Sequence, residues 1–79
     1  MVDSVKVETT IRDFLVRSKK DGVAFTRETG LYAGGIGLDS LATAELSAVL
    51  EDELGSDPFS EGEMPQTIGD IFDFYGATV

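Results

Sequence analysis

The stretch GLDSLATAELSAVLEDELG, residues 37–55, decides the fold. Asp39 or Ser40 is a suitable N-cap and Gly55 a suitable stop, so we predict a helix over Ser40–Leu54. At about 100° per residue, one face of this helix is apolar and is expected to enter a core. That face carries Ala42, Leu46, Val49 and Leu50, with Leu54 at its edge.

The opposite face of this helix has a smaller apolar strip with acids beside it. The strip consists of Leu41, Ala44 and Ala48, and the acids are Glu45, Glu51 and Asp52. An apolar strip that faces water resembles a docking surface. Single exposed Ala and Leu residues are also common on ordinary helices, so the pattern alone leaves both readings open.

The segment before this helix predicts another helix and a long loop. Helical spacing relates Val7, Ile11, Phe14, Leu15 and Ser18 and predicts a helix over about residues 3–20. Asp3 or Ser4 would begin it, and Asp21-Gly22 would end it. Residues 21–39 contain five glycines, which favours a long loop. Its expected anchors to the core are Val23, Phe25, Leu31, Tyr32 and Ile36.

The segment after residue 55 predicts two shorter elements. Residues 56–66 form a linker with one helical turn around Pro58–Glu61. A last short helix follows a loose capping box, Thr67 to Asp70, and ends at Gly76. No segment alternates as a strand would. We therefore expect an all-α fold in a single domain, residues 1–79: a small four-helix bundle with three main helices, one short helix and a long loop between helices 1 and 2.

Composition excludes several classes of function. The chain has no Cys and no His, so it lacks a thiolate, a disulfide and the commonest general base and metal ligand. The net charge is -9, and all six basic residues lie between Lys6 and Arg27. Residues 28–79 hold eleven acids and no Lys or Arg, so nucleic acid and anionic membranes are not expected partners. A basic protein partner would be attracted, although the acids can equally serve solubility.

No enzymatic site is predicted. A Ser-His-Asp triad is impossible without His, and Gly37-Leu38-Asp39-Ser40-Leu41 lacks the bracketing glycines of a nucleophile elbow. Gly34-Gly35-Ile36-Gly37 lacks the lysine of a phosphate-binding P-loop, and the acids lack the spacing of a calcium loop. We expect no catalytic residue and no metal site.

The sequence also predicts where the protein is located and whether it is discrete and monomeric. Residues 1–4 lack a basic signal region and no apolar segment follows, so we expect a cytoplasmic protein. The Met1 start and the absence of linker sequence favour a discrete protein over a domain of a larger synthase. The exposed apolar strip is too thin for an obligate dimer, so we expect a monomer.

Ser40 is the one candidate for chemistry. It stands at the predicted start of a helix after a glycine-rich loop, where the helix dipole and free N–H groups tolerate a phosphate. The negative charge of Asp39 opposes a phosphate there, which suggests that Asp39 caps the helix or meets a modifying enzyme. The alternative reading of Ser40 is an ordinary N-cap serine.

The residues around Ser40 resemble a known family. Gly37-Leu38-Asp39-Ser40-Leu41 is similar to the attachment signature of acyl and peptidyl carrier proteins, in which Asp-Ser-Leu opens the second helix. Ala44-Glu45-Leu46 and residues 49–55 resemble the rest of that helix, and residues 65–71 resemble the start of the last helix. The resemblance covers about residues 31–75.

The resemblance implies a modification and a set of partners. A phosphopantetheinyl transferase would move a 4'-phosphopantetheine arm from coenzyme A to Ser40, and the thiol of the arm would carry an acyl group as a thioester. An adenylating or acyltransferase enzyme would load this arm, and a downstream synthase or transferase would use the cargo. The corresponding partner-binding face consists of Asp39, Leu41, Ala44, Glu45, Ala48, Glu51 and Asp52.

Other features resemble discrete carriers of polyketide or nonribosomal peptide pathways more than fatty-acid carriers. They are Ser47, Ala48, the glycine run at 34–37 and Ser56-Asp57-Pro58-Phe59. The polar Ser47 and the small alanines make a long buried acyl chain less favourable, so we expect a short acyl or aminoacyl cargo. The alternative function is an unmodified acidic helical adaptor, which would not need Ser40.

Overall fold

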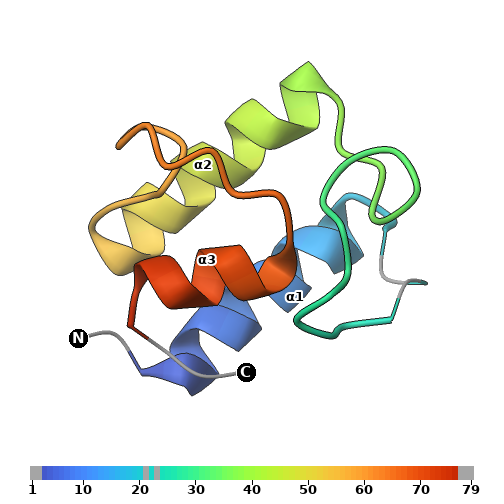
Figure 1. Cartoon of the computed structure of the whole chain (residues 1–79). Helices are drawn as coiled ribbons and strands as arrows, with labels where there is room; N and C mark the ends of the chain where they lie inside the picture. Colours follow the sequence, from blue (N-terminus) through green and yellow to red (C-terminus); the bar gives the residue numbers. More distant parts are fainter. Residues whose placement is uncertain (1–2, 21, 23, 77–79) are drawn as a thin grey trace.

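The computed structural model describes residues 3–20, 22 and 24–76 and is helical, as predicted. It contains α1 (Ser4–Arg17), α2 (Ser40–Leu54) and α3 (Ile68–Phe74), and the described residues form no strand. Figure 1 shows the three helices around a common interior, with the long connection between α1 and α2 folded beside the start of α2. One isolated antiparallel bridge joins Gly30 to Thr67.

Helix α1 has the predicted core face but ends earlier than predicted. Val7, Ile11, Phe14 and Leu15 are buried, while Ser18 is half-buried. Asp3 caps the start, where its Oδ1 accepts a hydrogen bond of 2.9 Å from Val5 N. The helix ends at Arg17 because Lys19 adopts a left-handed φ of 58° and Lys20 N donates to Leu15 O at 2.7 Å. The predicted stop at Asp21-Gly22 is therefore late, and Asp21 lies outside the described residues.

The connection between α1 and α2 is more ordered than a structureless loop. Its backbone is hydrogen-bonded to the start of α3: Leu31 N donates to Gln66 O and Ile68 N donates to Thr29 O, each at 3.0 Å. Of its expected anchors, Leu31 and Ile36 are buried and Phe25 and Tyr32 are half-buried. Val23 lies outside the described residues. Leu38 is also buried and was not among the predicted anchors.

The predicted fourth helix around Pro58–Glu61 does not form. Residues 58–62 make consecutive turns, in which Glu63 N donates to Pro58 O at 2.9 Å. The turns cannot continue as a helix because Gly62 and Met64 both adopt left-handed φ values, 80° and 52°. The described part of the chain is thus built on three helices, and the predicted fourth, short helix is not confirmed.

Helix α3 closes the core. Thr67 and Asp70 form the predicted capping box, and Ile68, Ile71 and Phe72 are buried. The last helical residue is Phe74, two residues before Gly76. Helix α2 faces this core with Ala42, Leu46 and Leu50, which are buried, while Val49 and Leu54 are half-buried at the edge. The predicted core face of α2 is therefore confirmed.

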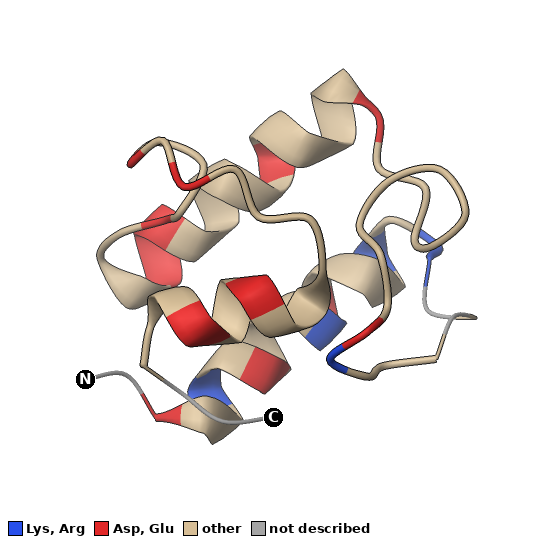
Figure 2. Cartoon of the chain, viewed as in Figure 1, with Lys and Arg blue, Asp and Glu red and all other residues tan. Residues whose placement is uncertain are grey.

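The basic residues are confined to one part of the molecule. Figure 2 shows Lys and Arg, together with some acids, on α1 and on the connection that follows it, whereas the charged residues of α2, α3 and the turns between them are all acids. In the described part of the chain, no helix has the length and apolar character needed to cross a membrane.

Candidate functional site: the serine and groove at the start of α2

Ser40 is the first residue of α2, and its side chain is exposed. Asp39 caps the helix: its Oδ1 accepts from Ala42 N at 2.8 Å, and its carbonyl accepts from Thr43 N at 2.9 Å. Ser40 is therefore not an ordinary N-cap serine. Its hydroxyl has no hydrogen-bond partner among the described residues, which leaves it available for reaction.

The first turn of α2 provides a favourable place for an anionic substituent on Ser40. Asp39 occupies the N–H groups of Ala42 and Thr43, whereas those of Ser40 and Leu41 have no acceptor among the described residues. Unsatisfied N–H groups at a helix start bind phosphate oxygens, and the helix dipole adds to this attraction. A phosphodiester at Ser40 would therefore fit, with the exposed carboxylate of Asp39 as the opposing charge beside it.

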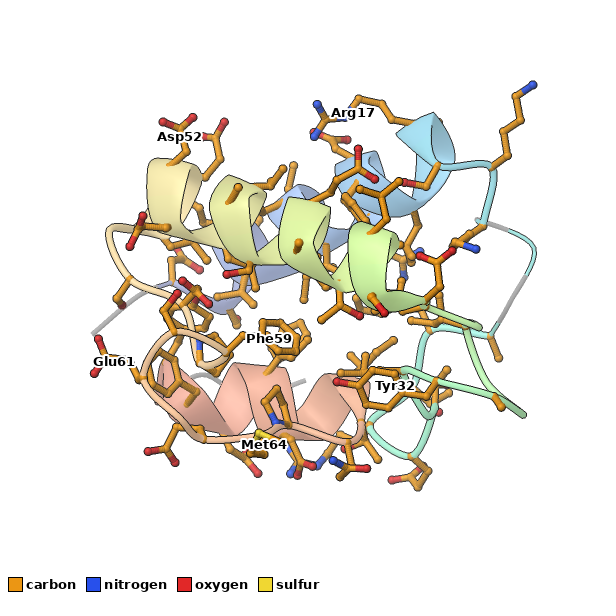
Figure 3. All side chains as sticks on the ribbon, turned by 90° about the horizontal axis from the view of Figure 1, so that it is seen from above. Arg17, Tyr32, Asp52, Phe59, Glu61 and Met64 are labelled. Carbon is orange, nitrogen blue, oxygen red and sulfur yellow. The ribbon has the colours of Figure 1, made fainter. Side chains whose placement is uncertain are left out.

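An open groove of about 710 Å³ begins at Ser40. Two aromatic side chains form part of its walls: Tyr32 from the connection after α1 and Phe59 from the turns before α3. Figure 3 shows the Phe59 ring between the ribbons of α2 and α3 and the Tyr32 ring beside one end of the α3 ribbon. The groove is lined by Tyr32, Leu38, Asp39, Ser40, Thr43, Ala44, Ser47, Phe59 and Ser60. A group attached to Ser40 thus lies next to a partly apolar surface.

The floor of the groove is connected to a buried carboxylate. Ser47 Oγ donates to Asp57 Oδ1 at 2.8 Å, and Ser60 N donates to the same oxygen at 2.9 Å. Asp57 is only 1% exposed, and its Oδ2 is buried with no hydrogen-bond partner among the described residues. Burial raises the pKa of Asp57, but the hydrogen bonds from Ser60 and Ser47 outweigh burial and hold the pKa below its ordinary value. Asp57 is therefore ionised at neutral pH.

The neighbouring Tyr75 responds to the same environment. Its hydroxyl donates to Ser56 O at 2.6 Å, and Tyr75 is buried. Burial, and then the charge of Asp57, raise the pKa of Tyr75 above its ordinary value, so the phenol remains protonated. Tyr75 thus ties the end of the last helix to the residues that flank Asp57.

The outer face of α2 is exposed at all seven positions predicted to meet partners. These are Asp39, Leu41, Ala44, Glu45, Ala48, Glu51 and Asp52. Leu41 is 71% exposed, so this face presents one large apolar side chain directly after Ser40. No salt bridge involves the acids of α2 in the described part of the chain. This acidic outer face is therefore available to a partner.

Sequence reasoning found Ser40 and the outer face but missed the groove. Tyr32 was expected to be only a core anchor and Asp57 part of a linker, while Ser47 was expected to disfavour a long buried acyl chain. One local signal for Asp57 exists: Asp-Pro followed by Ser three residues after Asp is typical of a capped turn. No local signal indicates that the capped turn lies against Ser47.

Comparison of the chain with models of protein families, with curated proteins and with solved structures finds no match. The described residues contain no group of three or more Asp, Glu, His or Cys side chains that could hold a metal ion. The functional assignment therefore depends on the geometry at Ser40 and on the resemblance of residues 31–75.

Proposed function

We propose that this protein is a carrier: Ser40 holds a 4'-phosphopantetheine arm, and the arm presents an acyl or aminoacyl group to partner enzymes. The observation that carries the proposal is that the Ser40 hydroxyl, at the start of α2, is free of hydrogen bonds to the described residues. This hydroxyl is exposed and not used in capping, because Asp39 caps α2 in its place. The N–H groups of Ser40 and Leu41 suit a phosphodiester oxygen, and the groove begins at the same residue.

The arm would supply the thiol that this chain lacks and carry the cargo as a thioester. The residues of the chain would do the rest without catalysing a reaction. The outer face of α2 would bind partners, with Leu41 as the apolar contact and Glu45, Glu51 and Asp52 as the charges that attract a basic surface. Such docking should be weak and sensitive to salt, which suits a carrier that visits several enzymes in turn.

The partners in this proposal are enzymes of three kinds. A phosphopantetheinyl transferase attaches the arm, an adenylating or acyltransferase enzyme loads it, and a downstream synthase or transferase takes the cargo. Polyketide or nonribosomal peptide biosynthesis in the cytoplasm is the setting that the resemblance favours. Tethering raises the effective concentration of the cargo at each partner, which is the energetic contribution of a monomeric carrier.

The direct test is a mass measurement. The purified protein is incubated with coenzyme A, magnesium and a broad-specificity phosphopantetheinyl transferase, and its intact mass is recorded. We expect a gain of one arm for the natural sequence, no gain for Ser40→Ala, and a full gain for Ser60→Ala. Ser60 is a matched control because it is an exposed serine that lines the same groove. A folded protein that gains no arm beside an active control carrier would sink the proposal.

An unmodified acidic adaptor is the second candidate, supported by the exposed acidic outer face of α2. An adaptor would bind its basic partner equally well with Ser or Ala at position 40, since Asp39 maintains the cap in both. The mass measurement therefore separates the two candidates, because only a carrier depends on the Ser40 hydroxyl.

A further inference from the structure

The contact between Ser47 and Asp57 decides whether Ser47 can donate or accept hydrogen bonds in the groove. Ser47 lines the groove, and its Oγ donates to Asp57 Oδ1 at 2.8 Å. A serine hydroxyl has one hydrogen to donate and two lone pairs that accept. Because that hydrogen is committed to Asp57, Ser47 can offer only acceptor capacity to a molecule lying in the groove.

Asp57 cannot reverse this arrangement. An ionised carboxylate accepts hydrogen bonds and donates none. Ser60 N donates to the same Oδ1 at 2.9 Å and holds the carboxylate in place. These hydrogen bonds keep the pKa of Asp57 below its ordinary value in spite of burial, so Asp57 stays ionised across the neutral range.

Apart from the helix start, which suits the phosphodiester, the charged side chains at the groove are negative. Asp57 Oδ2, on the carboxylate that accepts from Ser47, is buried and has no hydrogen-bond partner among the described residues. Asp39 lines the groove beside Ser40, and none of the described lining residues is Lys or Arg. A negative field in a partly desolvated groove favours a cationic group over a neutral one.

The walls of the groove suit a short stem that ends in a polar head. Tyr32 and Phe59 are both half-buried and add aromatic surface to the lining that contains Ser40 and Ser47. The faces of aromatic rings also attract ammonium groups. A long saturated chain, in contrast, would have to pass the hydroxyls of Thr43, Ser47 and Ser60, where it gains nothing.

From these contacts we infer that the groove selects, among groups carried on Ser40, acyl groups that donate a hydrogen bond, and that it favours aminoacyl groups with a free ammonium. Ser47 is the residue that determines this specificity, and Asp57 is the positioning residue behind it. The inference rests on the proposed attachment of cargo at Ser40.

The test can be made independent of the transferase. Because the chain has no cysteine, Ser40→Cys provides one thiol that can be alkylated with synthetic arms of pantetheine length. Two matched pairs of amide-linked arms are used. The β-alanyl and butyryl arms differ only in a terminal ammonium or methyl group, and the β-hydroxybutyryl and acetoacetyl arms differ in having a donor or only acceptors. Occupancy of the groove is read from amide shifts of Thr43, Ser47 and Ser60 in two-dimensional NMR spectra.

We expect the donor arm of each pair to occupy the groove roughly fivefold more than its partner. One added hydrogen bond changes an equilibrium constant by about this factor. Ser47→Ala should abolish the difference within the hydroxyl pair, while the ammonium pair keeps the part of its difference that comes from the charges and aromatic rings at the groove. Thr43→Val, which removes another hydroxyl from the groove without affecting Asp57, should leave both intact. Equal occupancy within both pairs, or a difference within the hydroxyl pair that survives Ser47→Ala, would overturn the inference.

A second variant separates the charge of Asp57 from its shape. Asp57→Asn retains an acceptor for Ser47 and Ser60 but removes the negative charge. The advantage of the ammonium arm should fall, while the advantage of the neutral hydroxyl arm remains. An ammonium advantage that is unchanged in Asp57→Asn would refute the role of Asp57. Failure of the mass measurement would instead refute the carrier function, so the two results are distinguishable.

Discussion

The two aromatic walls of the groove are held by different kinds of interaction. Tyr32 belongs to the connection between α1 and α2, where backbone groups hold one another: Gly35 N and Gly37 N both donate to Tyr32 O, at 2.9 and 3.1 Å. Phe59 belongs to the turns before α3, where the carboxylate of Asp57 holds the chain through Ser60 N and Ser47 Oγ. One wall thus depends on backbone geometry and the other on a side-chain charge.

Because the two walls are held by different interactions, different substitutions should destabilise each of them. The hydrogen bonds that hold Tyr32 O join backbone groups only, so this backbone-held wall should respond to steric changes more than to pH. The wall held by Asp57 should depend less on shape. It should weaken when the carboxylate is removed or protonated. Substitutions on each side can break or sharpen this comparison.

The largest effect is expected at Gly35 in the backbone-held wall. A Cβ at this position would overlap the carbonyl group of Gly30, to which Ile36 N donates at 2.8 Å. Backbone atoms cannot move aside as a flexible side chain can, so Gly35→Ala should destabilise the fold by about 3 kcal/mol or more. Urea denaturation gives the free energy of unfolding.

Gly22→Ala is the matched control, because nothing lies within 4 Å of the added Cβ there. Its free energy of unfolding should be unchanged or higher by up to about 1 kcal/mol. If Gly35→Ala is as stable as Gly22→Ala, the close approach of Gly30 and Gly35 does not hold this wall.

The next largest effect is expected at Asp57 in the other wall. Asp57→Ala removes the acceptor of both Ser47 Oγ and Ser60 N, so we expect a loss of about 2 kcal/mol in the free energy of unfolding. Asp52→Ala is the control, since Asp52 is exposed on α2 and forms no salt bridge in the described part of the chain. Equal stability of the two variants would show that Asp57 does not organise the turns.

The dependence of this difference on pH sharpens the comparison further. The folded pKa of Asp57 is below its ordinary value, so the unfolded state binds protons more readily in acid. Its contribution to stability is complete above the ordinary carboxyl pKa, about 4, and is lost as the pH falls through the folded pKa. The stability difference between the natural sequence and Asp57→Asn should therefore shrink as the pH is lowered from about 6 to about 2.

Other acids with a lowered pKa do not obscure this measurement. Arg27 donates to Asp73 at 3.0 and 2.7 Å, and these hydrogen bonds hold the pKa of Asp73 below its ordinary value. Because Asp73 is present in both proteins, its contribution cancels in the difference. A difference that stays constant with pH would mean that the charge of Asp57 is not what stabilises the turns.

Periodic parts of the structure could be predicted from the sequence. Helix α2 has caps at both ends and an apolar face at helical spacing, and its observed bounds, Ser40–Leu54, equal the predicted ones. The buried faces of α1 and α3 follow from the same periodicity. The end of α1 could not be predicted in this way, because it depends on a left-handed Lys19, and lysine has no intrinsic preference for that conformation.

The groove could not be predicted because no periodicity describes it. Tyr32 and Phe59 lie in two segments without regular structure, and tertiary contacts such as Leu31 N to Gln66 O decide how these segments approach α2. The burial of Asp57 likewise depends on Ser47, ten residues earlier, across the end of a helix. Ser40 and the outer face of α2, in contrast, needed only a helix start and a helical period.

The smallest effects are expected at the start of α2, where the groove begins. Asp39→Ala removes the acceptor of Ala42 N and should destabilise the fold by about 1 kcal/mol. Ser40→Ala should change stability by less than about 0.5 kcal/mol, because alanine suits a first helical position and Ser40 contributes no cap. Thermal and urea denaturation of both variants at pH 7 decide between these expectations. The reverse order, with Ser40→Ala the more damaging, would make Ser40 a structural serine and remove the observation on which the carrier proposal depends.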